Sequence, residues 1–486
     1  MPDAVLDLFR FLRHLPDLGL WLTLGWIVYL VGIGSWIVLQ KREPAATLSW
    51  LMGLALLPYV GFAVYYVFGP QRIRRQRTRR SKLLAALPGR DALAASDGEA
   101  HELAVLGQAA SGMPPSTATD VQLLVDGAAK YTALLADIAK ARREVHLEYY
   151  IYQPDRSGTA LRDALAERAR AGIKVRLLMD AVGSTKASTR FFAPLVEAGG
   201  EIAWFHPVRW LQVWQRPWLN LRTHRKIVVI DGRIAYTGGM NITDEQDERL
   251  DDKAYRDLHL RLEGDVVQTL QQVFVEDWAY ATGAPPPAAG TTSEDIAAPA
   301  TPAVKRIPAQ VLVSGPDSPW ETIHRLHVAA IHAASERVWL MTPYFVPGEA
   351  AMMALTSAAL GGLDVRLLVP RRSDSLLVTL AARSYFDTLL KAGVHIHEYG
   401  PRLLHSKALL VDDDLALIGS ANFDNRSFRL NFEVSMLFLD AGVATELAGL
   451  IEAESAKAPL VHEDRARPLL TVRLPEALAR LLSPLL

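Results

Sequence analysis

The hydrophobic positions divide the chain into an apolar N-terminal part and a longer part in which short apolar runs alternate with amphipathic stretches. Two uncharged runs, 18–39 and 45–69, are each long enough to cross a hydrocarbon core of about 30 Å, which takes roughly 20 helical residues. Trp and Tyr side chains lie near several ends of these runs, as they do at membrane interfaces. We therefore expect residues 1–70 to form a membrane module with two spans.

Two alternatives remain open for this N-terminal part. A cleaved signal peptide followed by one buried helix would also be apolar, but the first run is longer than the core of a signal peptide and no A-x-A cleavage pattern follows it. If both runs span, Lys41 and Arg42 face outward, against the usual placement of positive charge. A shallow re-entrant hairpin would remove that conflict.

A basic segment follows the second apolar run. Residues 71–82 contain seven Lys or Arg residues and no acid, and such a segment is normally retained in the cytoplasm. We therefore expect a multi-pass membrane protein whose remaining domains are cytoplasmic, with residues 71–119 acting as juxtamembrane segment and connector. The same cations should attract anionic membrane lipids, at about 1 kcal/mol per charge.

From residue 120 onward, the pattern is typical of an α/β fold. Amphipathic stretches at 128–142 and 159–171 lead into β-rich runs at 145–152 and 173–179, and runs at 338–342, 362–369 and 392–396 repeat this order. We predict two duplicated lobes, 120–280 and 309–486, built from βαβ units on a largely parallel sheet. The Ala- and Pro-rich segment 281–308 is predicted to be a linker.

One segment interrupts the duplication. The first half has extra residues at 207–221, where Trp210, Trp214 and Trp218 are spaced by four beside several arginines. An interfacial amphipathic helix near the active site and an ordinary surface helix packed on the core explain this spacing equally well.

Composition limits the possible chemistry. The net charge is −1, so the overall balance indicates no polyanionic partner, and we expect no nucleic acid. The chain has no cysteine, which excludes disulfides, thiolate zinc sites and a cysteine nucleophile.

The strongest chemical signal is a short motif that occurs twice. The spacing H-x-K-x-x-x-x-D is formed by His224, Lys226 and Asp231 and again by His405, Lys407 and Asp412. A glycine-rich turn follows each copy at the same offset and ends in Asn241 or Asn422. One such match would be weak evidence. Two matches, each followed by a similar glycine-rich turn, indicate a phosphate site built from two halves.

The two ends of each motif are expected to have different jobs. Side chains alternate across a strand, so His224 and Lys226 share one face, whereas Asp231 has the opposite parity and begins an Asp-Gly turn. The second copy has the same parity. We therefore expect His and Lys to take part in the chemistry and the Asp to hold the hairpin or its neighbours.

Two-fold packing would bring both copies of the motif into one cleft. Lys226, Lys407 and the amides of Asn241 and Asn422 could then surround a phosphoryl group. One imidazole can attack phosphorus, while the other exchanges a proton with the alcohols. Each imidazole needs a partner on its second nitrogen.

Two carboxylates are candidates for these partners. Asp257 follows His224 and Glu433 follows His405 at similar intervals, each at the start of a later strand. The scheme requires no metal and no other cofactor. His395 and His397 could form a ligand pair, but an ordinary strand pair is favoured because no third ligand is suitably placed in the nearby sequence.

At these residues the chain resembles the phospholipase D superfamily with two H-K-D motifs, and more narrowly the bacterial cardiolipin synthases. The narrower likeness rests on residues 44–51 with Pro58, Gly61, Tyr66, Phe68 and Gly69, and on residues 419–427. It implies two tandem lobes of mixed sheets flanked by helices, with a pseudo-two-fold axis, in a protein of the bacterial inner membrane.

The resemblance also implies a reaction. A phosphatidyl group is held on histidine without a metal, and two phosphatidylglycerols condense to cardiolipin with release of glycerol. By the family's usual preference, His224 forms the covalent intermediate and His405 acts as acid and then base.

Four other functions remain possible. A hydrolytic phospholipase D, or a transferase that uses another alcohol, would use the same residues. A soluble nuclease of the superfamily is disfavoured by the two apolar runs. A non-catalytic membrane scaffold could bind anionic lipid through the basic segment, but it has no need of two nucleophile candidates.

Overall fold

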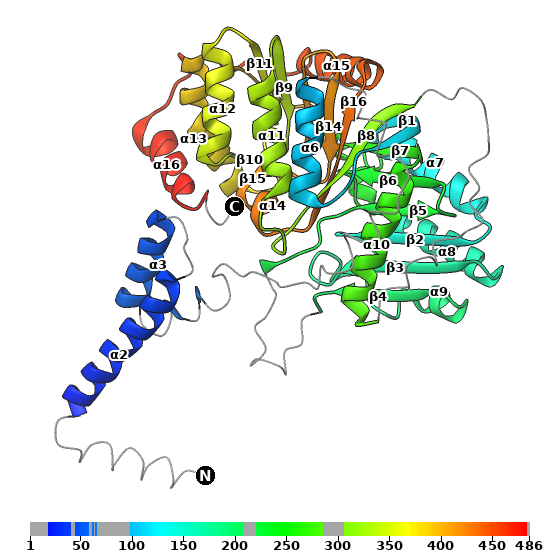
Figure 1. Ribbon diagram of the computed structural model, residues 1–486, viewed down its shortest axis with the longest axis horizontal. Helices are drawn as coiled ribbons and strands as arrows, with labels where there is room; N and C mark the ends of the chain where they lie inside the picture. The colour runs from blue at the N-terminus through cyan, green and yellow to red at the C-terminus, as the bar shows by residue number, and fades with distance from the viewer. Residues whose placement is uncertain are drawn as a thin grey trace. The chain divides into compact units, whose positions relative to one another are not determined.

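The computed structural model describes residues 18–39, 44–57, 61–62, 64–65, 98–207, 220–284 and 306–483 (Figure 1). The chain divides into two compact units. One comprises Met1–Gln71 with Arg209–Asn220, and the other comprises Arg72–Val208 with Leu221–Leu486.

In the smaller unit, helix α2 (Leu18–Val38) is the candidate membrane span. Its segment Gly19–Val38 has a mean hydropathy of 1.7 and is long enough to cross a bilayer. Helix α3 (Pro44–Leu56) packs against it, with Ile37, Leu54 and Tyr65 forming a small buried cluster. Within the described ranges no second helix has the length of a span. The expected second span at 45–69 is described only in part, and the basic segment 71–82 lies outside the described residues.

The larger unit is built on a 14-stranded sheet that runs through both halves of the chain. The strands of the first half are β1 (Ser116–Val125), β2 (Glu144–Tyr149), β3 (Lys174–Asp180), β4 (Glu201–Phe205), β5 (Ile227–Ile230), β6 (Ile234–Gly238) and β7 (Leu258–Gly264). Those of the second half are β8 (Ile307–Ser314), β9 (Arg337–Met341), β11 (Asp364–Pro370), β12 (His395–Tyr399), β13 (Ala408–Val411), β14 (Leu415–Gly419) and β16 (Glu433–Leu439).

The strand order shows the duplication directly. It is β12-β11-β9-β13-β14-β16-β8-β1-β7-β6-β5-β2-β3-β4, so each strand of one half has a counterpart at the mirrored position in the other. The halves meet where β1 pairs with β8, with Ser116 opposite Ala309. This arrangement confirms two tandem lobes related by a pseudo-two-fold axis.

The expectation of a largely parallel sheet is wrong. Parallel pairing is confined to β2-β3-β4 and β9-β11-β12, and the strands between them pair antiparallel. The βαβ units occupy the two outer parts of the sheet, where a helical crossover returns the chain in the same direction. Hairpins such as β5–β6 fill the middle, so the sheet is mixed.

Helices cover both faces of the sheet (Figure 1). The helices of the first half are α6 (Glu99–Ser111), α7 (Asp126–Ala139), α8 (Arg156–Arg170), α9 (Ala193–Glu197) and α10 (Val266–Thr282). Those of the second are α11 (Thr322–Ala333), α12 (Glu349–Leu360), α13 (Leu376–Ala392), α14 (Asn425–Arg429), α15 (Ala441–Ser455) and α16 (Leu474–Leu481). A short two-stranded sheet joins β10 (Phe345–Val346) to β15 (Phe423–Asp424).

The apolar core follows from this layering. Residues of α10 and α15 share one buried cluster with strands from both halves, while α7 with α8 and α11 to α13 bury separate clusters. Helix α6 lies within the predicted connector 71–119 and packs on α11 and β8 of the second half. Residues 285–305 of the predicted linker lie outside the described residues, as do residues 208–219 of the Trp-rich insertion.

Candidate active site

The two motif segments lie just before β5 and β13 and are each held by the opposite half of the chain. Thr223 forms a parallel bridge with Phe432, and Arg256 forms one with Leu404. The His224 N–H donates to the Phe432 carbonyl at 2.8 Å, and the His405 N–H donates to the Arg256 carbonyl at 2.7 Å. Each histidine is therefore positioned by the residues that precede the last strand of the other lobe.

Each histidine also has its carboxylate partner in the other half of the chain. The Nδ1 atom of His224 lies 3.0 Å from both carboxylate oxygens of Glu433, and the Nδ1 atom of His405 lies 2.5 Å from Oδ2 of Asp257. In the sequence, each carboxylate follows the histidine of its own half, so the intervals indicate a pairing within each half. The structure corrects this, because each histidine contacts the carboxylate of the other half. With Nδ1–H donating to a carboxylate, each imidazole keeps Nε2 for chemistry.

Neighbouring groups hold both carboxylates in place. Ser420 Oγ donates to Glu433 Oε2, and Asn431 Nδ2 lies 3.3 Å from Oε1. On the other side, the Leu258 N–H donates to Asp257 Oδ1 at 2.7 Å. A Cβ at Gly239 would come within 2.1 Å of the same Oδ1, so the glycine-rich turn leaves the space that Asp257 occupies.

The two lysines lie beside their own histidines. Lys226 Nζ donates to the His224 carbonyl at 2.7 Å, and Lys407 Nζ lies 2.8 Å from His405 Nδ1. All four side chains are buried. Both cations are thereby fixed next to the imidazoles in an environment of low dielectric, where their charge acts strongly on an anion.

Burial has a large effect on the basic groups. It lowers the pKa of His224 to about 4, although Glu433 raises it. Burial also lowers the pKa of Lys226 to about 7 and that of Lys407 to about 8. Lys407 lowers the pKa of His224 and Lys226 further, and Lys226 lowers that of His405, so the two motifs share one electrostatic site.

The pKa values of the two partner carboxylates are also lowered, because the effect of burial is outweighed by neighbouring positive charges. Burial raises the pKa of Glu433, but His224 and Lys226 lower it more. Burial also raises the pKa of Asp257, and Lys407 and His405 outweigh it. Both carboxylates therefore stay ionised and favour the Nδ1–H tautomer of their histidines.

The motif aspartates lie at the other end of the hairpins, as strand parity led us to expect. Asp231 and Asp412 have φ of 53° and 48°. The carboxylate of Asp231 accepts the N–H groups of Arg142, Arg143 and Glu144 at 2.7–3.0 Å. Asp412 accepts those of Ser335, Glu336 and Arg337 at 2.8–2.9 Å. Each aspartate thus ties a hairpin turn to the start of the neighbouring strand.

The two asparagines after the motifs differ in their surroundings. Asn241 Oδ1 accepts the Ile151 N–H at 3.3 Å, and the Asn241 carbonyl accepts from Lys130 Nζ at 2.7 Å. Asn422 is buried, and its Oδ1 has no hydrogen-bond partner among the described residues. Phosphate binding by either amide remains a prediction.

Three supporting residues were missed in the sequence. Lys130 is fully buried behind the first glycine-rich turn, Ser420 holds Glu433, and Gln246 Nε2 lies 3.4 Å from His405 Nδ1. A lysine on the apolar stripe of an amphipathic helix was a usable signal for Lys130, and Ser420 lies inside the second glycine-rich turn. Gln246 lies in a 3-10 turn, Asp244–Gln246, and its role had no local signal.

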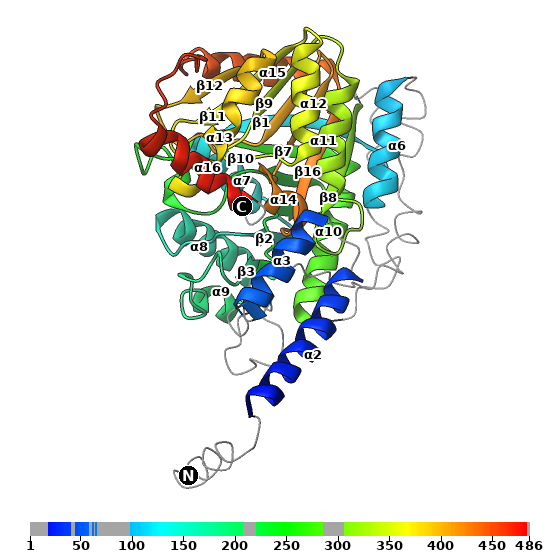
Figure 2. The same cartoon turned by 90° about the vertical axis from the view of Figure 1, so that its left-hand side faces the viewer.

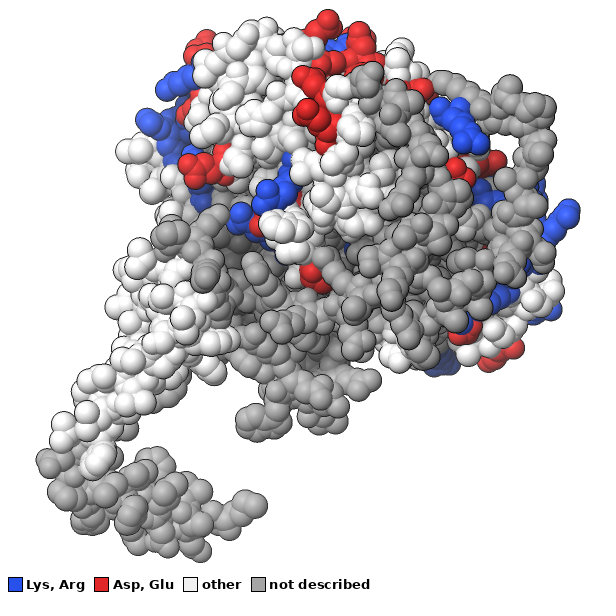
Figure 3. Space-filling view, in the orientation of Figure 1, with Lys and Arg blue, Asp and Glu red and all other residues white. Residues whose placement is uncertain are grey.

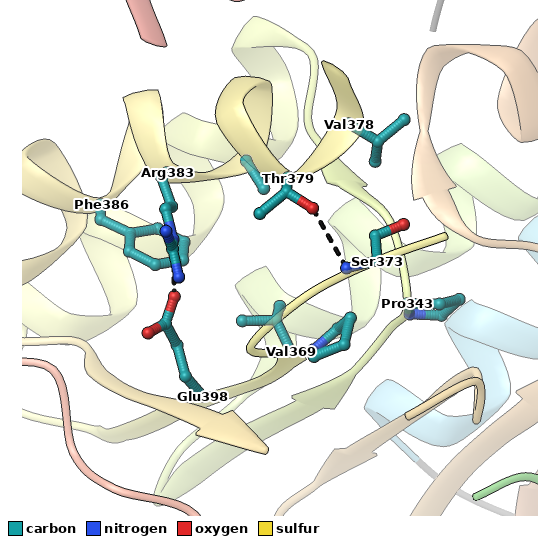
Figure 4. Close-up of a pocket in the computed structure, with 10 residues that line it drawn as sticks. Pro343, Val369, Ser373, Val378, Thr379, Arg383, Phe386 and Glu398 are labelled. Carbon is teal, nitrogen blue, oxygen red and sulfur yellow. Dashed lines mark hydrogen bonds and ion pairs between the residues drawn. The ribbon is translucent and has the colours of Figure 1, made fainter. Parts of the chain in front are cut away.

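Other candidate groups lie away from these residues. His395 and His397 lie on β12, where His397 Nδ1 is 3.3 Å from the Ala458 carbonyl. The described part of the chain contains no group of three or more His, Asp or Glu side chains suited to a metal ion. A small hollow between β11 and α13 includes the Arg383–Glu398 ion pair at 2.8 Å and no motif residue (Figure 4).

Comparisons with known proteins match both halves of the duplicated chain. The chain matches the family described as cardiolipin synthase, PLD-like domain, over residues 134–278 and 328–454. Residues 26–70 match the family described as phospholipase D-nuclease N-terminal. Together with the apolar helix α2, this N-terminal match indicates membrane association.

Relatives match over nearly the whole chain. Cardiolipin synthase 2 of Bacillus anthracis is 39% identical over 473 residues, covering 93% of this chain and 89% of that protein. Cardiolipin synthase 1 of the same organism is 35% identical over 510 residues, covering 99% and 98%. The crystal structure of phosphatidylserine synthase from Haemophilus influenzae Rd KW20 has a TM-score of 0.58 at 15% identity, covering 79% of this chain and 100% of that one, and shares the fold. The chain belongs to the cardiolipin synthase family of phospholipase D-like enzymes.

Proposed function

We propose that the protein is a cardiolipin synthase that transfers a phosphatidyl group from one phosphatidylglycerol to another. The observation that carries the proposal is the pair of buried His–carboxylate contacts that cross between the halves, each with a lysine beside it. The names of the relatives support the choice of product.

In the first step, Nε2 of His224 attacks the phosphorus of one phosphatidylglycerol. The bond between phosphorus and the glycerol oxygen breaks, and His405 gives its Nε2 proton to that oxygen. Glu433 stabilises the positive charge that develops on His224. Lys226 and Lys407 offset the negative charge on the phosphoryl oxygens.

The second step reverses these roles. The hydroxyl of a second phosphatidylglycerol gives its proton to Nε2 of His405 and attacks phosphorus, and the bond to His224 breaks. Cardiolipin leaves and both imidazoles return to their starting states. Water in place of the second lipid would give phosphatidic acid, and another alcohol would give its phosphatidyl ester.

We also propose that the enzyme is a multi-pass protein of the bacterial inner membrane with its catalytic lobes in the cytoplasm. The basic composition of residues 71–82 supports this orientation, and the apolar runs 18–39 and 45–69 support two crossings. The same basic residues would bind anionic membrane lipid.

The test is product analysis with the purified full-length enzyme and phosphatidylglycerol in mixed micelles. Cardiolipin and glycerol are expected in equal amounts, and EDTA should not change the rate because lysines neutralise the phosphate. Phosphatidic acid as the main product would indicate a hydrolase. No product, with lipid binding retained, would indicate a scaffold. The His224→Ala variant controls for contaminating activity.

A further inference from the structure

The C-terminal helix α16 presents a row of leucines on the outside of the larger unit. Leu474, Leu478 and Leu481 are 45%, 54% and 75% exposed. Their spacing places them on one face of the helix. Leu470, in the preceding turn Leu469–Arg473, is 74% exposed. Contiguous exposed leucines mark an interaction surface, whereas single ones do not.

The opposite face of α16 is fixed to the protein. Helix α16 packs along α13 (Figure 2). Glu476 is buried and bonds to Arg467 at 2.6 Å, and Ala479 is also buried. The Arg480 guanidinium lies 4.5 Å from the centre of the Tyr385 ring. The direction in which the leucines point is therefore set by packing and by an ion pair.

The exposed charge of this stretch is positive. Glu476 is the only acid in residues 469–483, and it is buried and paired. Arg473 and Arg480 are exposed beside the leucines. The space-filling view shows Lys and Arg gathered beside uncharged surface on the side that carries α16, with a smaller acidic patch among them (Figure 3). Leucines flanked by arginines fit the boundary between acyl chains and anionic headgroups.

The end of α16 is connected to the second motif. The Ser483 carbonyl accepts from Asn425 Nδ2 at 3.2 Å, and Ser483 Oγ bonds the Tyr385 hydroxyl at 2.9 Å. Asn425 begins α14, whose Ser427 Oγ accepts the Asn422 N–H at 3.1 Å. A short series of bonded residues thus links the leucine-bearing helix to the turn that follows His405 and Lys407.

We propose that α16 lies in the plane of the phospholipid interface, with its leucines among the acyl chains and its arginines at the headgroups. The proposal rests on the proposed function, which requires phospholipid at the site. Because α16 is bonded to the motif turn, this second contact holds the active site toward the bilayer surface, which the α2 anchor alone does not do.

The absence of cysteine allows a direct test in the full-length enzyme. Leu478→Cys carries an environment-sensitive fluorophore, and the protein is reconstituted in vesicles of phosphatidylglycerol and phosphatidylcholine. Leu360→Cys on α12, where Leu360 is 73% exposed, is the matched control. We expect lipid brominated on its acyl chains to quench the label at 478 and iodide to leave it bright, with the reverse at 360.

Two outcomes would overturn the proposal. A label at 478 that iodide quenches as strongly as at 360 would show that α16 faces water. A label protected from both quenchers would show that protein covers the leucines, either a second copy or the chain's own N-terminal segment.

Activity provides a second readout. The combined variant Leu474→Gln, Leu478→Gln and Leu481→Gln should form cardiolipin about tenfold more slowly on vesicles, since interfacial binding scales with buried apolar area. Its rate on short-chain phosphatidylglycerol dispersed in detergent should match wild type. Val105→Gln with Met353→Gln and Leu360→Gln is the matched control. An equal loss on both substrates, or no loss on vesicles, would contradict the proposal.

A wild-type enzyme that makes no cardiolipin would instead refute the proposed function and leave the quenching result unaffected.

Discussion

At the scale of single residues, the site depends on keeping cations and carboxylates charged while they are buried. Burial lowers the pKa of Lys226 to about 7 and that of Lys407 to about 8. The ammonium groups are therefore only partly protonated near neutral pH in the free enzyme. A bound phosphate group would stabilise the protonated forms of both lysines, and the protonated lysines would in turn bind the phosphate more tightly.

The first prediction concerns pH. His405 must be protonated to release the glycerol, so kcat/KM should first fall as pH rises through its pKa, which burial lowers below the ordinary 6.5. The lysines act as cations, so a further fall is expected through about 7 to 8, where Lys226 and Lys407 lose their protons. His224 must be neutral to attack, so kcat/KM should also fall as pH drops through about 4. In Lys226→Arg the part of the fall that Lys226 causes should move upward, because a guanidinium stays protonated. A rate that keeps rising beyond pH 9 would contradict this assignment of charge.

The second prediction tests the crossed pairing. Glu433→Gln should mainly slow formation of the covalent intermediate, because Glu433 supports the nucleophile His224. Asp257→Asn should slow breakdown more than formation, because Asp257 supports His405, which is the base for the second alcohol. Each overall rate should fall by about 10² to 10⁴, the usual range for acid–base assistance. Rapid-quench kinetics separates the two steps. Glu452→Gln, at an exposed position on α15, is the control. If the two variants exchanged their effects, the carboxylates would serve the histidines of their own halves.

At the scale of elements, local patterns predicted several helices and strands, but not how the strands pair. The helix expected at 159–171 is α8 (Arg156–Arg170), and the strand expected at 173–179 is β3 (Lys174–Asp180). Hydrophobic periodicity reports such elements because it depends only on nearby residues. The pairing of β2 with β5 is antiparallel and depends on distant segments, so the mixed sheet had no local signal.

The site shows the same limit. His, Lys and Asp were recognisable by spacing, and parity separated the aspartates from the other two. Both partner carboxylates were also recognisable as candidates. Their crossed pairing was not, because it depends on bridges between Thr223 and Phe432 and between Arg256 and Leu404. Those contacts join segments from different halves of the chain, so the spacing of residues within one half does not reveal them.

The third prediction belongs to the hairpin turns. Asp231→Asn and Asp412→Asn should lower the free energy of unfolding by about 1–3 kcal/mol each, because an amide cannot accept all three backbone N–H groups equally well. Denaturant unfolding measures the loss. Burial raises the pKa of Asp412, but backbone N–H groups lower it more, below its ordinary 3.8. The stabilisation is therefore present above that pH and disappears as pH falls through the lower folded value. A fully stable but inactive Asp231→Asn enzyme would show that this aspartate acts in the chemistry.

At the scale of the whole molecule, the duplication makes one active site rather than two. The two halves join where β1 pairs with β8. The residues just before the last strand of each half bridge to the motif segment of the other half. Neither half alone contains a histidine with its carboxylate. From this shared construction we expect both copies of the motif to be needed for a single transfer reaction.

The fourth prediction concerns orientation in the cell. The basic composition of residues 71–82 predicts that everything beyond residue 82 faces the cytoplasm. Protease added outside spheroplasts should leave the lobes intact, and lysis should expose them to cleavage. The predicted linker 281–308 is a suitable site to follow, because exposed segments of small and polar residues are preferred sites of cleavage. Cleavage there in unlysed spheroplasts would reverse the topology.

The most direct test of the central claim is to trap the phosphatidyl group on its histidine. In His405→Ala, breakdown of the intermediate should be slowed more than its formation, because the base for the second alcohol is missing. The reaction of this variant with phosphatidylglycerol labelled in its phosphatidyl group is quenched with a denaturant at mildly alkaline pH, because acid cleaves the bond between phosphorus and imidazole. Peptide mass spectrometry should then find the label on His224. Label on His405 in the His224→Ala variant, with none on His224 in the wild type, would contradict the account.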